Sequence, residues 1–298
     1  MWFKNIHLYR FNESIPFDQI ELEEKLKEQK FQPCARQSKE SMGWISPLSR
    51  DGDDLVYEAN KCFLFAMRRE QKVIPPSMVN ELLEERIAEI EMEQGRKVFR
   101  KERQQFKEDI LALLLPKAFT RSTHTHAYFD TQANILAVNA ASSALADTFI
   151  SLLIESLGTL GAVKLDSEPS PSLTMNGWLT EQLPENLELT GEYELKDPQD
   201  ERTARFKDTE SSNDIIVDLI ADGFWTTKLG VQFEDIFKCN ITDKLQIKSI
   251  KYTEQLLNQN DELDLEDATA KFDADFVLMS SSIRAFYQQL KVWFPMPE

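Results

Sequence analysis

Prolines mark both ends of the most strongly patterned segment of the chain. Pro75 and Pro76 fit the first turn of a helix, and the glutamates that follow suit the positive end of its dipole. A helical pattern then continues for about forty residues, interrupted only at Gly95, until Pro116 ends it. The segment therefore predicts either a projecting helical hairpin that folds back at Gly95 or one long helix that bends there.

Apolar side chains recur at helical spacing along this segment. We expect them to form the buried faces of the hairpin, and they fall into two groups. The first group contains Leu82, Leu83, Ile87 and Ile90, with Val98 as a further candidate, and the second contains Phe99, Phe106, Ile110, Leu113 and Leu114.

The rest of the chain mixes short strand and helix patterns without βαβ regularity, which predicts the α+β class. Helices are expected over about 18–29, 142–157, 212–221 and 264–293, with a short one near Trp178. Strands are expected over about 2–11, 62–74, 121–130, 134–139, 161–165, 187–195, 203–207 and 244–248, the last within a meander over 226–252. Gly43 and Trp44 lie in a turn-rich stretch. We expect an N-terminal α+β region (1–75 and 117–166), a charged helical hairpin (76–116) and a C-terminal α+β region (167–298).

The charge of the chain is unevenly distributed. The formal net charge is −17, which by itself argues against phosphate binding. Residues 61–121 nevertheless carry 13 basic and 10 acidic side chains, whereas residues 122–298 carry 13 basic and 30 acidic ones. A basic surface can therefore exist on an acidic body. Because an acidic exterior repels phosphate, any DNA site must be confined to a cleft or a lumen.

Cysteine usage and hydropathy narrow the class of protein further. Cys34, Cys62 and Cys239 are odd in number and far apart, which predicts reduced cytoplasmic thiols and neither a disulfide framework nor a zinc site. No stretch approaches the roughly 20 apolar residues of a membrane span, and no signal peptide is apparent. We expect a cytoplasmic protein without a membrane partner.

Two groups of side chains could hold a metal ion. His124 and His126 share a face of a predicted strand with Asp130, but no third ligand follows at a diagnostic spacing, and an ordinary polar strand face explains them better. The acidic run 261–267, followed by Asp273 and Asp275, could suggest two-metal nuclease chemistry; helix capping explains it better. No nucleotide-binding or hydrolase motif is present, so we expect no catalytic residues, no metal and no cofactor.

Basic side chains gather in several clusters, each of which is either a nucleic-acid contact or a solvated face. Arg96, Arg100, Arg103 and Lys107 follow helical spacing and predict one basic stripe. Lys244, Gln246 and Lys248 are expected on one face of a strand. Other clusters are Arg68, Arg69 and Lys72 before the hairpin, Lys97 and Lys101 beside the stripe, and Arg202, Arg205 and Lys207 in the C-terminal region.

An ordered series of motifs resembles the RdgC family over essentially the whole chain. No single motif is decisive, but their order and position together are highly specific. The matching segments are Trp2-Phe3-Lys4-Asn5 with Tyr9-Arg10, Gly43-Trp44, Lys72-Val73-Ile74-Pro75, the run Leu114 to Arg121, Thr227-Lys228-Leu229 and the run Phe272 to Met279.

The resemblance implies a nucleoid-associated protein that binds duplex DNA, and single-stranded DNA more weakly, without sequence preference. Horseshoe-shaped subunits of this family close head to head and tail to tail into a ring-shaped homodimer with a positively charged hole, and family members restrain RecA-promoted strand exchange. Candidate DNA-binding residues are then Arg68, Arg69, Lys72, Arg96, Lys97, Arg100, Lys101, Arg103, Lys107, Arg121, Lys207, Lys244 and Lys248.

By motif, Phe119 matches the phenylalanine at the interface where the family's ring opens. The lysine–glutamine pair that the family places near this gate falls around Phe206-Lys207, where only Lys207 keeps a charge, so the chain departs from the family pattern there. Two other functions stay open: a metal-dependent DNA-processing enzyme that uses the C-terminal acidic cluster, and an adaptor whose charged hairpin binds an acidic protein.

Overall fold

A computed structural model describes residues 1–48, 52–185, 187–209, 214–259 and 268–297. It has the α+β composition that the sequence predicts, with all its strands in one antiparallel sheet. The strands are β1 (Ile6–Phe11), β2 (Glu40–Ile45), β3 (Val56–Ala59), β4 (Cys62–Val73), β5 (Phe119–Asp130), β6 (Ile135–Asn139), β7 (Ala162–Lys164), β8 (Glu188–Lys196), β9 (Thr203–Phe206), β10 (Trp225–Phe233), β11 (Phe237–Thr242) and β12 (Ile247–Tyr252). The helices are α1 (Gln19–Lys27), α2 (Pro76–Gln94), α3 (Arg100–Leu114), the short 3-10 turn η1 (Leu115–Lys117), α4 (Ser143–Leu157), α5 (Pro171–Thr180), α6 (Asp214–Ala221), α7 (Glu254–Asn258) and α8 (Ala268–Trp293).

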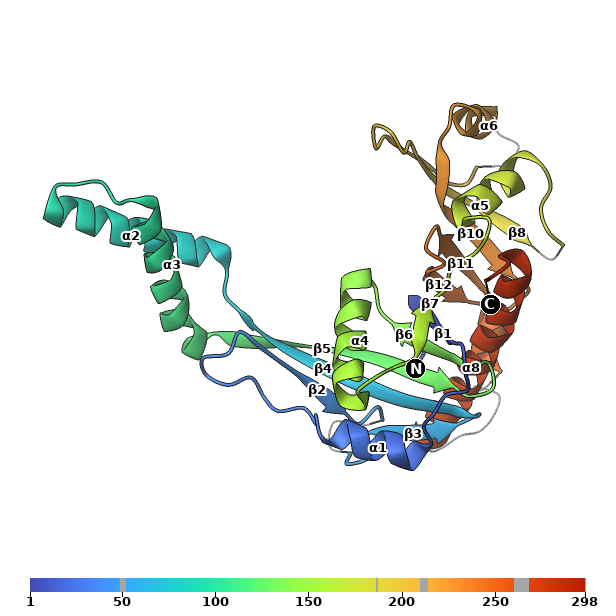
Figure 1. Ribbon diagram of the computed structural model, residues 1–298, viewed down its shortest axis with the longest axis horizontal. Coiled ribbons are helices and arrows are strands. Elements are labelled where there is room, and N and C mark those ends of the chain that lie inside the picture. The colour runs from blue at the N-terminus through green and yellow to red at the C-terminus, as the bar shows by residue number, and fades with distance from the viewer. Residues whose placement is uncertain (49–51, 186, 210–213, 260–267, 298) are drawn as a thin grey trace.

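The sheet bends into an open arch with a helical element at each end (Figure 1). Its strand order is β2-β4-β5-β6-β1-β12-β11-β10-β8-β9, so β1 and β12 join the N-terminal and C-terminal strands. The junction is narrow, since a single residue pair, Ile6 with Ile247, is in register between β1 and β12. The hairpin of α2 and α3 forms one end of the arch and α6 lies at the other (Figure 1).

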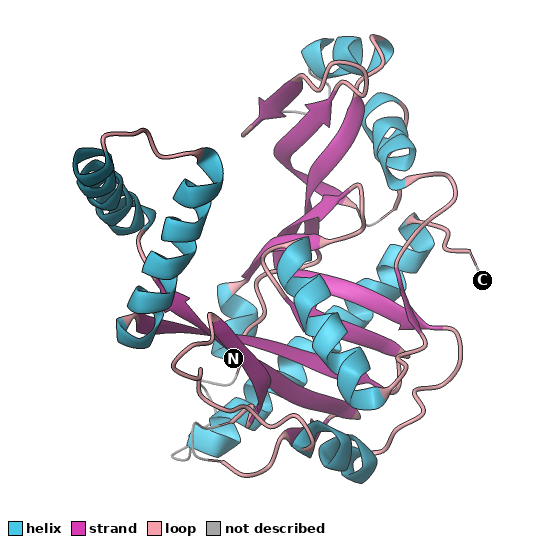
Figure 2. Ribbon diagram, turned by 60° about the vertical axis from the view of Figure 1, so that its left-hand side comes forward, coloured by secondary structure: helices cyan, strands magenta, loops and turns pink. Residues whose placement is uncertain are grey.

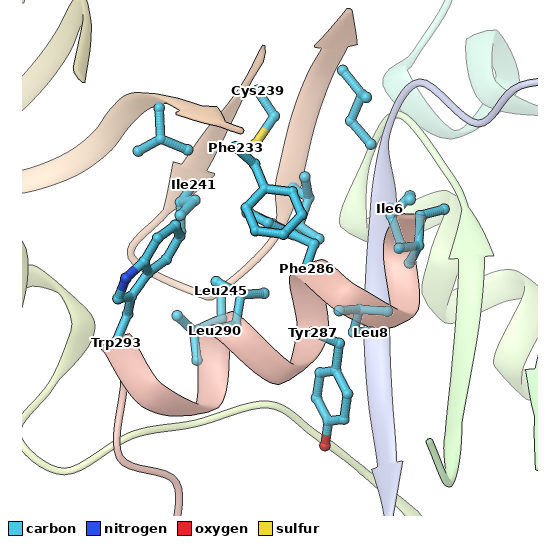
Figure 3. Packing of buried hydrophobic residues seen from close by; sticks show 14 of the residues in the cluster. Ile6, Leu8, Phe233, Cys239, Ile241, Leu245, Phe286, Tyr287, Leu290 and Trp293 are labelled. Atoms are coloured by element: carbon cyan, nitrogen blue, oxygen red, sulfur yellow. The ribbon is translucent and has the colours of Figure 1, made fainter. Parts of the chain in front are cut away.

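Two hydrophobic cores hold the body together. Helices α1 and α4 pack on one face of the N-terminal strands, around residues such as Trp44, Phe65 and Phe149. Helices α5 and α8 pack on the C-terminal strands, and Figure 3 shows Phe286 of α8 against Phe233 of β10. Because Ile6 and Leu8 of β1 belong to this second core, α8 also reaches the junction of the sheet.

A buried ion pair ties α8 to the N-terminal strands. The Nε of Arg284 lies 2.7 Å from Oδ2 of Asp130, a carboxylate with no exposed surface, at the end of β5. Arg284 also donates to the carbonyl of Asn60, at 2.8 Å. The other oxygen of Asp130 accepts the backbone N–H groups of Gln132 and Ala133. These hydrogen bonds of the carboxylate thus all lie within the chain.

The hairpin prediction is confirmed in its two-helix form. Gly95 adopts φ 60°, a left-handed conformation that a glycine permits without strain, and ends α2. The buried residues are Val79, Leu83, Ile87 and Ile90 of α2 with Ile110 of α3. The predicted apolar stripe was wrong at three positions, because Leu82, Phe99 and Leu113 are 36 %, 70 % and 68 % exposed. A crossing of two helices, which Figure 2 shows, buries only a narrow strip of each.

Several strand predictions were incomplete. Strands β2 and β3 were missed, because the first lies in a turn-rich stretch and both are short. The predicted strand face of Lys244, Gln246 and Lys248 was wrong: residues up to 246 form the turn between β11 and β12, with Leu245 at φ 51°, and β12 begins at Ile247. The ends of α4 are as predicted, with Ser142 as its N-cap and Gly158 after its last turn.

No helix within the described ranges is long and apolar enough to cross a membrane.

Replacing Arg284 with alanine should lower the free energy of unfolding by about 3–5 kcal/mol, because the Asp130 carboxylate would stay buried without its partner. Chemical denaturation would measure the loss. The matched control is Arg86→Ala, which removes an exposed ion pair with Glu89 and should cost less than about 1 kcal/mol. Equal effects of the two substitutions would contradict the role assigned to Arg284.

Candidate nucleic-acid interface

The C-terminal strands have one covered face and one bare face. Alternate residues such as Phe237, Cys239 and Ile250 point into the core beneath α8 and α5. The residues between them are polar and lie on the opposite face. Because α8 lies on the outer side of these strands, the bare face is directed toward the opening of the arch (Figure 1).

Lysines are the principal cations of this bare face. Lys238 of β11 stands directly opposite Lys251 of β12, and both are exposed. Lys228 of β10 is half-buried and pairs with Thr242 and Glu194 of the neighbouring strands. Within the described part of the chain, none of the three makes an ion pair. Two like charges in direct cross-strand register destabilise a sheet, so an anionic ligand would be favoured here.

These three lysines were missed by sequence reasoning, which looked for clustered or helically spaced charge. The available signal was the alternation of polar and apolar residues along each strand, which places every second side chain on one face. Lys238 and Lys251 each stand between apolar residues in the sequence. Their closeness depends on the strand register, and a single sequence does not give that register.

Lys248 lies at the junction of the sheet beside the N-terminal end of α4. Its ammonium group is 3.0 Å from Nε2 of His7 and 3.0 Å from the carbonyl oxygen of Ala141. Burial and the neighbouring Lys248 charge lower the pKa of His7 to about 4, so its ring is neutral at pH 7 and can accept from the lysine. Gln246 donates to Ser143 of α4. Both residues line a cleft at this junction, together with His7 and Lys244.

The basic stripe of the hairpin divides into paired and unpaired cations. Arg96 makes a bidentate contact with Glu102, and Arg103 pairs with Glu84 across the two helices. The four other predicted cations of this element are exposed and have no carboxylate partner among the residues described: Lys97, Arg100, Lys101 and Lys107. Arg100, Lys101 and Lys107 line a groove between α2 and α3.

The predicted cations of β4 and β5, the strands that lead to the hairpin, also divide into cations with and without an ion-pair partner. Arg68 pairs with Glu70 and lies over the ring of Phe31, at 4.4 Å, and Arg69 pairs with Glu40. Lys72 and Arg121 have no ion-pair partner in the described ranges. In the C-terminal arm, Arg202 and Arg205 pair with neighbouring carboxylates, whereas Lys207 is exposed after β9.

Phe119 begins β5 and is 86 % exposed, so it does not belong to the hydrophobic core of the chain. Strand β5 pairs with β4 along its whole length but with β6 only from Ala127 onward. Residues 119–126 therefore present a free strand edge next to the exposed phenylalanine.

The candidate metal ligands are occupied by structural contacts. Asp130 bonds Arg284, and Asp273 accepts the hydroxyl of Tyr57 at 2.6 Å. Asp275 lies 3.5 Å from the N-terminal amine. Burial lowers the pKa of His126 to about 4. No group of three His, Cys, Asp or Glu side chains that could hold a metal ion occurs among the described residues, and the acidic run 261–267 lies outside them.

Comparisons with known proteins agree on one family. The family model described as "RdgC: Putative exonuclease, RdgC" matches residues 1–296. The recombination-associated protein RdgC of Aeromonas hydrophila is 36% identical over 292 residues, which cover 97% of this chain and 96% of the relative. The proteins of the same name from Tolumonas auensis and Colwellia psychrerythraea are 36% and 35% identical over 293 and 298 residues, which cover 97% and 99% of this chain and 97% of each relative.

Replacing Lys238 with glutamine should raise the free energy of unfolding by about 0.2–1 kcal/mol at low salt, because it removes the repulsion from Lys251. Urea denaturation at low and at high ionic strength would measure it. The gain should shrink in high salt, which screens exposed charges. A loss of stability, or a gain that salt does not change, would contradict the interpretation that Lys238 and Lys251 repel each other across the two strands.

Proposed function

The chain belongs to the RdgC family of recombination-associated proteins, and on this premise we propose that it binds duplex DNA, with little regard to sequence, inside a ring formed by two copies of the arch. The one observation that carries the proposal is the bare face of the C-terminal strands, where unpaired lysines line the opening of an arch in a chain of net charge −17. Because the acidic exterior repels phosphate, DNA would be stable only along this inner surface.

The chemistry of the inner surface favours backbone contacts over base reading. Lysine is a flexible point charge with no fixed geometry of donors, and it suits phosphate oxygens at variable positions. Lys228, Lys238 and Lys251 project from a broad sheet face and not from a helix that could enter the major groove. Together with Lys72, Arg121, Lys207, Lys244 and Lys248, cations that make no ion pair among the described residues, they would position a duplex through its phosphates.

Occupation of DNA gives a simple route to a role in recombination. A protein ring around a duplex occupies the surface on which strand exchange must proceed, so binding alone would restrain RecA without a direct contact between the two proteins. We propose that this is how the chain acts, as a component of the nucleoid and without enzymatic activity. Single-stranded DNA, with its lower charge density, should bind the lysines more weakly.

The exposed Phe119 and the free edge of β5 support closure of the ring at the arm that carries the hairpin. A large aromatic side chain that is 86 % exposed at the end of a rigid strand is a suitable anchor for a partner subunit.

Gel shifts with duplexes of unrelated sequence across a salt series test the binding mode. We expect affinities that agree within a few fold and fall steeply with salt. A preference for one sequence of more than about a hundredfold, or about 2.7 kcal/mol, would contradict a phosphate-directed ring.

The family description names an exonuclease, so the same incubations with Mg²⁺ or Mn²⁺ should be followed for DNA cleavage. Loss of cleavage in Asp273→Ala alone would be ambiguous, because this substitution also removes the hydrogen bond from Tyr57. Tyr57→Phe is the matched control, since it breaks the same bond and leaves the carboxylate in place. Cleavage that survives in Tyr57→Phe but not in Asp273→Ala would replace our proposal with the enzymatic one.

The unpaired cations of the hairpin should contribute to binding more than the paired ones do. Replacing Arg100, Lys101 and Lys107 with alanine should lower the slope of log K against log salt by about 0.9 for each lost phosphate contact, hence by about 2.7 per subunit. The control is Arg86→Ala, whose side chain pairs with Glu89 in the opposite groove of the hairpin. A normally folded triple variant with an unchanged slope would show that this groove is a solvated surface.

Phe119→Ala should weaken one of the two dimer contacts by about 2–4 kcal/mol and leave the fold intact, because the side chain buries almost nothing in its own subunit. The variant should keep its melting temperature and remain partly dimeric in sedimentation experiments, yet lose retention on circular DNA. A large fall in melting temperature with normal DNA retention would show that Phe119 stabilises the fold and does not close the ring.

A further inference from the structure

The turn of the hairpin displays an aromatic ring among cations. Phe99 is 70 % exposed, although its position in the sequence pattern predicts a buried residue. Its neighbours in the chain are Lys97 on one side and Arg100 and Lys101 on the other, and all three are exposed. None of them has an ion-pair partner among the residues that the structure describes. An exposed ring is here flanked in the chain by three exposed cations.

The backbone of this turn is held by several side-chain bonds. Arg96 contacts Gln94 at 2.8 Å and clamps both carboxylate oxygens of Glu102. Glu102 in turn accepts the backbone N–H of Phe99 at 3.1 Å, which caps the first turn of α3. Glu91 accepts the N–H of Val98 at 3.0 Å. Phe99 is therefore presented on an ordered backbone, and most of the entropy cost of fixing it is already met in the free protein.

The small core of the hairpin gives Phe99 no place to pack. Val98 and Phe106 are among the partly buried residues that pack on the buried strip, whereas Phe99 is 70 % exposed and does not belong to this cluster. The ring therefore contributes little to the stability of the fold. The arrangement suits a ligand that is both aromatic and anionic.

We propose that Phe99 is a stacking platform for an unpaired nucleobase, with Lys97, Arg100 and Lys101 holding the phosphates on either side of it. Aromatic rings between cations bind single strands in this way, since every base has a face that can stack and every nucleotide carries a charge. This inference rests on the proposed function in one respect, because it requires DNA to reach the hairpin. It goes further in assigning a second mode, in which gaps or single-stranded tails are recognised at the turn while the arch holds duplex.

The charge of the turn selects this occupant over the other candidates. A basic peptide would be repelled by three free cations, and a second copy of the same turn would bring like charges together around a symmetry axis. An acidic protein segment would satisfy the cations but offers few planar groups for the ring. A single-stranded nucleotide supplies both partners in one unit.

The test uses a duplex with a central gap that contains the fluorescent base 2-aminopurine, and the intact duplex of the same sequence. The variants are Phe99→Ala, Phe99→Tyr and the control Met92→Ala, which removes another exposed apolar side chain of the hairpin (91 % exposed). In the wild type, stacking should change the 2-aminopurine signal. Phe99→Ala should lose this change and bind the gapped DNA about tenfold more weakly, a typical loss for one stacked base. Phe99→Tyr and Met92→Ala should behave as the wild type, and all four proteins should bind the intact duplex equally.

Three outcomes would overturn the inference. Phe99→Ala could keep the gap signal, which would leave the ring without a base. It could lose gapped and intact duplex equally, which would make Phe99 a duplex contact. Phe99→Ala could lose the 2-aminopurine signal only to the extent that it loses the dimer in sedimentation. The Phe99 side chain would then contact the partner subunit and not a base. Failure of the wild type to bind intact duplex would instead count against the proposed function, so the two ideas fail separately.

Discussion

The shape of the arch depends on the attachment of α8 to the N-terminal strands. Between β1 and β12 one residue pair, Ile6 with Ile247, is in register, and the N–H of Ile250 donates to the carbonyl of Lys4 beside it, so backbone pairing holds the two halves of the sheet over a short length. The Arg284–Asp130 ion pair and the packing of α8 on Ile6 and Leu8 bridge the same junction from its covered face. A buried pair is costly to break, and it therefore fixes a geometry more than it adds stability. The contact therefore helps to fix how the two halves of the sheet are placed relative to each other.

The fixed shape of the arch also determines which surface carries the cations. The chain has a net charge of −17, and under the proposed function it must still present cations to DNA. Side chains alternate between the two faces of a strand. One face of β10, β11 and β12 therefore builds the core beneath α8, and the other carries Lys228, Lys238 and Lys251. The unpaired cations of the hairpin extend this surface toward the other end of the arch. Ion pairs such as Arg69–Glu40 neutralise other cations and join neighbouring strands of the sheet.

Sequence reasoning succeeded where a local signal exists. Prolines and Gly95 delimited the hairpin, and Ser142 and Gly158 delimited α4, because caps act within a few residues. It failed where the answer depends on distant partners. Arg96 and Arg103 belong to the predicted stripe but are neutralised by Glu102 and Glu84. The register that places Lys238 opposite Lys251, and the narrow crossing that leaves Phe99 outside, are set by tertiary structure and have no counterpart in residue spacing.

Lys238 with Lys251, Phe99 and Phe119 share one physical property: each leaves a strong interaction unsatisfied in the isolated subunit. The lysine pair brings like charges together, and the two rings expose apolar surface that could have been polar at no cost to the fold. All three stand on elements whose backbones are held elsewhere, by the sheet ladder or by the bonds around Glu102. Rigid presentation of an unsatisfied group favours binding, because the ligand recovers the interaction without having to order the protein. The chemistry of the missing partner differs at each place. Under the proposals made above, phosphate would satisfy the lysines, an apolar pocket of a second copy would satisfy Phe119 at its free strand edge, and a ligand with both a ring and a charge would satisfy the turn around Phe99.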